Sequence, residues 1–304
     1  MAEITTRSIT ANGLSFTIDE CGTGPDIALC LHGFPESRRS WRHQLPLLAA
    51  RGWHAVAPDL RGYGGTTRPD TQADYHIDHL VADTAALFDA LGAEYGGRSA
   101  AEHGGRSAVG RRLLIAHDWG AIIAWIFAMR DTRPLDGLVI MNVPHPAVLR
   151  RTLNTLWSQK RKSWYIVFFQ VPRLPELLLG ARGAAGVGKA FTDSAVNAAN
   201  FPPEIIAHYR SNASQPGALT AMINYYRANF PGILDGPVRV IETPTLMVWG
   251  EQDVAIDIAN TQGYGPLVKD FTLVRLPDAS HWVQQDAPEA VNAALADWLE
   301  RTLA

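Results

Sequence analysis

Short runs of apolar and β-branched residues alternate with longer segments of helical periodicity along most of the chain. The strand-like runs cover residues 5–10, 14–19, 26–31, 54–58, 112–117, 137–142, 245–249 and 271–276. Helical patterns lie near 38–50, 79–91, 119–130 and 287–302. Strands that alternate with helices are typical of a mostly parallel sheet flanked by helices. The pattern therefore predicts an α/β fold with an eight-stranded sheet.

Two of the helical segments have a pattern that predicts how they pack. Residues 119–130 are apolar on all sides, which predicts a helix buried in the interior. Residues 287–302 follow a start resembling a capping box, Asp286 with Glu289. One face of this last helix is an apolar stripe, formed by Val291, Ala294, Leu295, Trp298 and Leu299. We expect that stripe to face the sheet.

The pattern changes between the strand at 137–142 and the strand at 245–249. Residues 145–232 are rich in aromatic residues, read as helical and contain no comparable strand signal. An insert at this point of an open α/β sheet lies over the carboxyl ends of the strands, where such sheets bind ligands. We therefore predict a core formed by residues 1–144 and 233–304, and a helical lid formed by residues 145–232.

Composition places few further limits on function. The chain has 304 residues, of which 47% are hydrophobic and 19% charged, and its net charge is −3. This balance indicates neither a nucleic acid nor a membrane as partner, and a monomer or homodimer is expected. The first residues lack the layout of a signal peptide, and no apolar stretch reaches the roughly 18 residues of a membrane span. We expect a cytoplasmic protein.

A short duplication interrupts the region before the fifth strand. Gly-Gly-Arg-Ser-Ala occurs at 96–100 and again at 104–108. Segments rich in glycine and serine are typical of surface loops, so we predict a loop that joins the helix at 79–91 to the strand at 112–117.

The most informative local pattern is Leu-Leu-Ile-Ala-His-Asp-Trp-Gly-Ala at 113–121. An apolar strand here runs into a turn of small residues and then into a helix, which is the arrangement of a nucleophile elbow. Asp118 occupies the position that serine often holds. A carboxylate is already an anion at neutral pH, so it suits displacement at a saturated carbon, which forms an alkyl ester. Asp118 therefore indicates cleavage of a C–O or C–halogen bond.

A base and an orienting acid follow downstream in the chain order expected of such sites. Asp253 follows the strand at 245–249, and His281 lies between the final strand and the last helix. We predict that His281 takes a proton from the water that attacks the ester, while Asp253 fixes the tautomer of the imidazole.

An oxyanion hole is predicted from His-Gly-Phe-Pro at 32–35, directly after the strand at 26–31. In this position the backbone N–H groups of Phe34 and Trp119 face the oxyanion that forms during ester hydrolysis. One such donor is typically worth about 3 kcal/mol in the transition state.

Taken together, four motifs resemble the epoxide hydrolases of the α/β-hydrolase superfamily. They are His-Gly-Phe-Pro, His-Asp-Trp-Gly-Ala, Gly-Glu-Gln-Asp and Ser-His-Trp, supported by Asn-Val-Pro-His-Pro at 142–146. The resemblance spans nearly the whole chain and implies an α/β-hydrolase fold without cofactor or metal. Ala116 stands where the family usually has glycine. Because alanine is also small, we expect the elbow to form.

The resemblance further implies two lid tyrosines that polarise the epoxide oxygen. Residues 163–170 match the first motif and nominate Tyr165, whereas 223–227 match the second and nominate Tyr226 rather than Tyr225. A phenol with a pKa of about 10 is a suitable donor to an alkoxide. Five aromatic residues of the lid are candidates to line the substrate pocket: Trp157, Trp164, Phe168, Phe191 and Phe201.

The resulting hypothesis is an enzyme that converts a small-molecule epoxide and water into a vicinal diol. Haloalkane dehalogenases share the arrangement of aspartate nucleophile, histidine and acid, and they remain an alternative. Their first motif, however, resembles His-Gly-Asn-Pro, with asparagine where this chain has Phe34. A dehalogenase acting on fluoroacetate needs arginines after the nucleophile, and residues 119–122 contain none. A ligand-binding homologue without catalytic activity is the second alternative.

Overall fold

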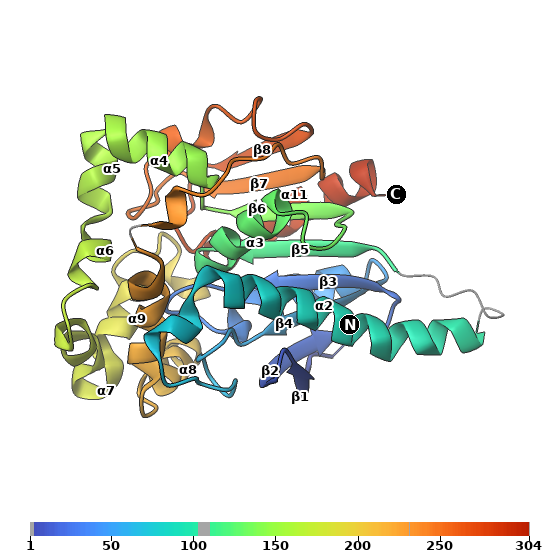
Figure 1. Cartoon of the computed structure of the whole chain (residues 1–304), viewed down its shortest axis with the longest axis horizontal. Helices are drawn as coiled ribbons and strands as arrows, with labels where there is room; N and C mark the ends of the chain where they lie inside the picture. The colour runs from blue at the N-terminus through green and yellow to red at the C-terminus, as the bar shows by residue number, and fades with distance from the viewer. Residues whose placement is uncertain (1–2, 103–109, 231, 304) are drawn as a thin grey trace.

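The computed structural model describes residues 3–102, 110–230 and 232–303, and of residues 95–102 the backbone alone. It contains an eight-stranded sheet with helices on both faces, and a further group of helices lies beyond one end of the strands (Figure 1). The predicted α/β class and eight-stranded sheet are confirmed.

The sheet has the strand order β1-β2-β4-β3-β5-β6-β7-β8. Only the pairings of β2 with β1 and β4 are antiparallel, and the five pairings from β4 to β8 are parallel. The predicted strands agree with those observed to within two residues at each end. The observed bounds are β1 Thr5–Ala11, β2 Leu14–Cys21, β3 Asp26–Leu31, β4 Trp53–Pro58, β5 Arg112–His117, β6 Gly137–Met141, β7 Thr245–Gly250 and β8 Phe271–Leu276.

Two hydrophobic layers cover the sheet, one on each face. Strand β5 contributes to both, because successive side chains of a strand point to opposite faces. Leu114 and Ala116 pack in the layer with α2 (Ile77–Glu102) and α3 (Trp119–Met129), whereas Leu113 and Ile115 face α1 (Gln44–Ala49) and α11 (Pro288–Thr302). All four side chains are fully buried, which explains why β5 is a continuous apolar run.

Two helix predictions agree with the structure. Nine of the eleven residues of α3 are buried, as predicted for a helix that is apolar on all sides. In α11 the four largest residues of the predicted stripe are buried against the second layer, namely Val291, Leu295, Trp298 and Leu299.

The structure corrects three predictions. The segment 38–50 is not one helix but a 3-10 turn, Arg38–Trp41, followed by α1. Pro46 has no N–H to donate to the carbonyl oxygen of Arg42, so it is tolerated in the first turn of α1 but not inside a helix that begins at residue 38. Asp286 is not a cap of α11: it ends the short helix α10 (Val283–Asp286), and its carboxylate accepts the N–H groups of Ser280 and Asn197. Helix α2 extends to Glu102, so the first copy of the duplication is helical rather than a loop. The second copy lies outside the described residues.

Residues between β6 and β7 form a group of helices, here called the helical insert (residues 145–232). Its members are α4 Pro146–Thr155, α5 Trp157–Lys162, α6 Trp164–Phe168, α7 Leu174–Thr192, α8 Pro203–Ala213 and α9 Ala218–Asn229. The insert lies beyond the carboxyl ends of the parallel strands, on the left of the view in Figure 1, with both termini farther to the right. Within the described residues, none of the helices combines the length and hydropathy needed to cross a membrane.

The junction of β3 with α3 leads to a first prediction. A Cβ atom on Gly120 would lie 2.2 Å from the carbonyl oxygen of Leu31, which is backbone and has no room to give way. We expect Gly120→Ala to lower the free energy of unfolding by about 3 kcal/mol, measured by urea denaturation. The matched control is Gly92→Ala in α2, where the added Cβ meets nothing within 4 Å. That change should raise stability by about 0.5–1 kcal/mol, because alanine favours a helix interior. Equal midpoints for the two variants would contradict the packing argument.

Candidate active site

Asp118 lies on the turn between β5 and α3, with φ 48° and ψ −121°. This region of backbone conformation is unfavourable for any residue with a Cβ atom, so the surrounding structure has to hold it. Two glycines allow that. Gly120 packs against the backbone of β3, and a Cβ on Gly33 would lie 2.2 Å from Asp118 Oδ1. The elbow forms with Ala116 buried before it, and it places the Asp118 carboxylate against the turn after β3.

The predicted oxyanion-hole residues flank this carboxylate. The N–H of Phe34 donates to Asp118 Oδ1 at 2.6 Å. Trp119 is the first residue of α3, so its N–H is one of those that have no acceptor within the helix. One oxygen of Asp118 is therefore held by backbone, which leaves Oδ2 as the oxygen available for reaction.

His281 and Asp253 lie on the other side of Asp118. His281 Nδ1 donates to Asp253 Oδ2 at 2.7 Å, and His281 Nε2 lies 3.7 Å from Asp118 Oδ2. The Asp253 carboxylate also accepts the N–H groups of Ala255 and Ile256 at 2.7 and 2.8 Å. The imidazole is thus oriented by a fixed carboxylate, with its free nitrogen facing Asp118.

Asn142 is a positioning residue that the sequence analysis did not identify. It follows β6, and its Nδ2 donates to Asp253 Oδ2 at 2.8 Å. Its Oδ1 accepts the N–H of Gly250 at 2.7 Å, at the end of β7. The motif at 142–146 contains this residue, but the resemblance assigned it no role; its place, a polar residue directly after a buried strand, was the physical signal.

A second buried network lies behind the elbow. His117 Nδ1 donates to Glu36 Oε2 at 2.8 Å, and His117 Nε2 donates to the carbonyl oxygen of His281 at 2.8 Å. Glu36 also accepts the N–H of Gly33 at 3.1 Å. Glu36 is fully buried, and its pKa is held below the usual value because the charge and hydrogen bond of His117 outweigh burial. This pair therefore ties the oxyanion turn, the elbow and the His281 loop to one another.

The protonation states of His281, Asp118 and Asp253 depend on one another. Burial works to lower the pKa of His281, but the charge of Asp253 and the interaction with Asp118 outweigh it and raise this pKa to about 10. Burial likewise works to raise the pKa of both carboxyls, and the interaction with His281 leaves each below its usual value. At neutral pH the site therefore holds two carboxylates and one imidazolium. Within the described residues, no cluster of His, Cys, Asp and Glu is suited to hold a metal ion.

Two cavities reach Asp118, and Tyr165 and Tyr226 line both of them. The inner cavity, of about 100 Å³, is mainly apolar, with Ile122 and Leu153 among its lining residues. The aromatic cavity, of about 370 Å³, is lined by aromatic residues and by His281. Asp118 and the tyrosine pair thus lie where the two cavities meet.

The two tyrosines are close neighbours. Their ring centroids are 6.0 Å apart with the rings nearly perpendicular, and Tyr226 packs in the same way against Trp119. Burial raises the pKa of both phenols above the usual value, and the negative charge of Asp118 raises it further. Both hydroxyls therefore remain protonated donors at neutral pH. Tyr225 instead donates to the carbonyl oxygen of Arg61 at 2.8 Å and is not among the lining residues of either cavity.

The five aromatic residues proposed as pocket lining divide into two groups. Trp164 and Phe168 line the aromatic cavity. The side chain of Trp157 is 77% exposed, and Phe191 packs between Tyr209 and Trp282, with Phe201 beside it. The structure therefore brings two of the five to the site.

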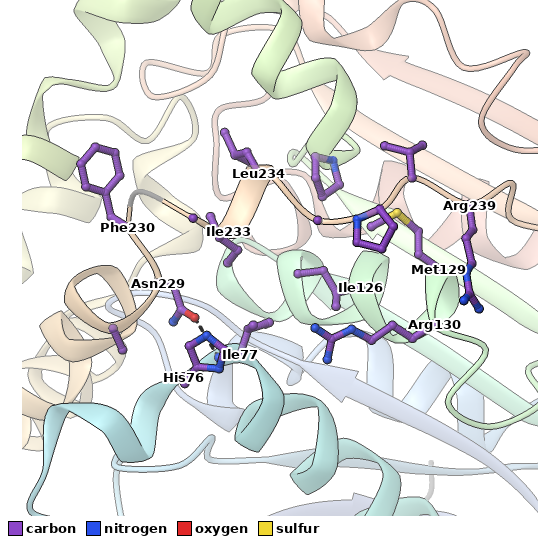
Figure 2. A pocket seen from close by; sticks show the side chains of 16 residues that line it. His76, Ile77, Ile126, Met129, Arg130, Asn229, Phe230, Ile233, Leu234 and Arg239 are labelled. Carbon is purple, nitrogen blue, oxygen red and sulfur yellow. Dashed lines mark hydrogen bonds between the residues drawn. The ribbon is translucent and has the colours of Figure 1, made fainter.

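A further pocket of about 400 Å³ lies outside the inner cavity (Figure 2). Arg130 and Arg239 lie at one end of it and Phe230 at the other. It shares Asn229, Phe230, Ile233 and Leu234 with the inner cavity, so these four residues separate the two spaces. The site residues proposed from the sequence are not among those that line this pocket.

The effect of the Asp118 charge on the pKa of His281 leads to a second prediction. Asp118→Asn removes one of the two anions that stabilise protonated His281, so the pKa of His281 should fall from about 10 toward its usual value. An NMR titration of the imidazole resonances, assigned with a His281→Gln variant, measures the change. Peptide mass spectrometry verifies that residue 118 remains asparagine.

Asp278→Asn is the matched control for this titration. Asp278 is exposed and lies three residues before His281, so the loss of its screened charge should leave the pKa of His281 unchanged. An unchanged His281 titration in the Asp118→Asn protein would show that Asp118 does not share charge with the imidazole.

Comparison with known proteins agrees with this geometry. The model of the alpha/beta hydrolase family matches residues 28–294. Epoxide hydrolase 3 of Xenopus tropicalis is 35% identical over 90% of this chain and 71% of its own length. The AB hydrolase superfamily protein YfhM of Bacillus subtilis is 32% identical over 96% of both chains. Bacillus megaterium epoxide hydrolase, solved in complex with an inhibitor, is 29% identical and matches with a TM-score of 0.85 over 97% of this chain and 100% of its own. The chain therefore belongs to the alpha/beta hydrolase family and, within it, to the epoxide hydrolases.

Proposed function

We propose that this protein hydrolyses an epoxide to a vicinal diol through an ester on Asp118. One observation carries the proposal: Asp118, Tyr165 and Tyr226 line the same two cavities, so a nucleophile faces two protonated phenols across a space open to substrate. The cavities are mainly apolar, which suits an uncharged epoxide.

In the first step Asp118 Oδ2 attacks a ring carbon while the epoxide oxygen lies between the two tyrosines. The C–O bond of the ring breaks, and the developing alkoxide takes a proton from a phenol. This leaves a hydroxyalkyl ester on Asp118 and a phenolate. General-acid help of this kind typically contributes about 10²–10⁴-fold.

In the second step water cleaves the ester. Once Asp118 is esterified it carries no charge, so one of the two anions that raise the pKa of His281 is gone. The imidazolium then gives up its proton, which restores the phenolate to a phenol, and the neutral imidazole becomes a base. It deprotonates the attacking water, and negative charge develops on Oδ1, the oxygen to which the N–H of Phe34 already donates. When the bond between the carboxyl carbon and Oδ2 breaks, Oδ2 takes a proton from His281 and leaves as a hydroxyl of the diol. The new carboxyl group of Asp118 then gives its proton to His281, which restores the carboxylate and the imidazolium.

The helical insert acts as the lid in this proposal. Its helices α6 and α9 supply the tyrosines, and its apolar side chains exclude bulk water from the ester. The reaction needs no cofactor, and we propose that it takes place in the cytoplasm. The structure offers no support for the dehalogenase alternative: the turn after β3 has Phe34, whose side chain donates no hydrogen bond to a halide. Turnover of styrene oxide would exclude the binding-protein alternative.

A single turnover in ¹⁸O-labelled water tests the covalent step. With enzyme in excess over substrate, the first diol should contain no label, because its new oxygen comes from Asp118. The peptide that contains Asp118 should gain 2 Da in mass spectrometry. Label in the first diol together with an unlabelled peptide would mean that water attacks the epoxide directly.

The tyrosine pair gives a fourth prediction. Tyr165→Phe and Tyr226→Phe should each lower the rate of ester formation by about 10–10³-fold, and the double variant should be slower than either, because each removes one of two proton donors. Stopped-flow tryptophan fluorescence under single-turnover conditions measures this rate.

Tyr225→Phe is the control for that comparison. It removes the neighbouring hydroxyl, which donates to Arg61, and should leave ester formation nearly unchanged at a modest cost in stability. A larger kinetic loss from Tyr225→Phe than from Tyr226→Phe would reverse the assignment.

A further inference from the structure

The outer surface of the helical insert exposes an unusual number of large apolar side chains. Seven of them lie within 22 consecutive residues, from α5 through α6 and the following connection to the start of α7, and we call them the apolar edge. They are Trp157 (77% exposed), Trp164 (63%), Val167 (64%), Val171 (41%), Leu174 (42%), Leu177 (69%) and Leu178 (58%). In Figure 1 these helices follow one another along the border of the molecule farthest from both termini. Exposed apolar residues gathered in this way mark an interaction surface.

The same stretch of chain is strongly basic. Residues 157–190 contain six lysines and arginines but a single acid, although the whole chain has a net charge of −3. Lys160, Arg161, Arg173 and Arg182 are exposed. The acid, Glu176, is paired with Arg227 at 2.5 Å. A partner that complements this surface therefore has an apolar interior and a negatively charged surface.

The aromatic cavity connects this surface with the reaction site. Trp164 is 63% exposed and also lines the aromatic cavity, as do Lys162 and Phe168. The next residue, Tyr165, faces Asp118 through the same cavity. The cavity therefore reaches the surface at the apolar edge, close to the exposed cations.

We propose that the apolar edge docks on an anionic lipid bilayer and that the enzyme takes lipophilic epoxides from that bilayer through the aromatic cavity. Tryptophan and leucine beside lysine and arginine form the side-chain set of an amphipathic segment that lies in the membrane interface. The substrate class rests on the proposed function. This proposal departs from the expectation that no membrane is a partner. That expectation was based on net charge and long apolar runs, neither of which reveals exposed side chains along one edge of the fold.

A second copy of the chain fits this surface less well. A symmetric dimer brings the same patch of both copies together, so the exposed cations of one would face those of the other. Like charges at such a contact are unfavourable, whereas anionic lipid neutralises them.

Vesicle binding tests the docking step. Wild-type protein should sediment with vesicles of phosphatidylcholine and phosphatidylglycerol, and much less with phosphatidylcholine alone. The triple variant Trp157→Ser/Leu177→Ser/Leu178→Ser and the charge variant Lys160→Glu/Arg161→Glu should each lose at least about tenfold in affinity. The control Val238→Ser/Val240→Ser removes two side chains of 43% and 49% exposure outside the apolar edge and should bind like wild type.

Kinetics test the delivery of substrate. Turnover of dissolved styrene oxide should be the same in wild type, triple variant and control, whereas the triple variant should be at least about tenfold slower on the epoxide of a long-chain alkene held in anionic vesicles. A triple variant that binds vesicles like wild type would overturn the proposal. So would wild-type binding that does not distinguish the two vesicle types.

Sedimentation velocity tests the other candidate for this surface, a second copy of the chain. A wild-type dimer that becomes a monomer in the triple variant, without vesicle binding, would assign the apolar edge to a second copy and overturn the proposal. If the wild type turned over neither epoxide, the proposed function would be contradicted. The vesicle measurements alone would then show whether the apolar edge docks on a bilayer.

Discussion

The site depends on the close approach of two turns, the one after β3 and the one after β5. The strands pair in parallel up to Leu31 and Ala116, so the turns that follow them begin side by side. Gly33 and Gly120 lack the two Cβ atoms that would hold the turns apart: one would lie 2.2 Å from Asp118 and the other 2.2 Å from the carbonyl oxygen of Leu31, at the end of β3. The oxyanion donor and the nucleophile are therefore placed by the register of the sheet, and neither can shift without disturbing its most buried strands.

The close approach of the two turns buries carboxylates, and burying a charge without compensation costs free energy. Asp118 and Asp253 are both buried, and two such charges need compensation. One imidazolium lies between them, and a backbone N–H group donates a hydrogen bond to the Oδ1 atom of each carboxylate. The arrangement is stable while Asp118 is ionised. It changes when Asp118 becomes an ester, and that change turns His281 from a counter-ion into a base.

Much of this organisation is readable from the sequence, because it is local. Buried parallel strands are continuous apolar runs, and the elbow is one uninterrupted pattern from Leu113 to Ala121. What the sequence did not reveal depends on contacts between distant segments. The acceptor role of Asp286 toward residues 197 and 280 is one example. The Glu36–His117 pair, 81 residues apart in the chain, is another. Two of the predicted pocket residues are misplaced for the same reason: Phe191 packs against Phe201 and Trp282 and does not line the aromatic cavity, nor does Phe201, because their places depend on how the helical insert packs.

Helix α6 shows how closely surface and reaction site are joined in this fold. It has five residues, and two consecutive side chains lie in different surroundings: Trp164 is largely exposed, whereas Tyr165 faces Asp118. A helix this short has too few internal hydrogen bonds to hold its shape alone, so its position depends on what packs against each side. Contact at the outer side therefore bears directly on the placement of a proton donor. Substitutions on α6 consequently alter both properties at once, and the two are separable only through residues of α5 and α7.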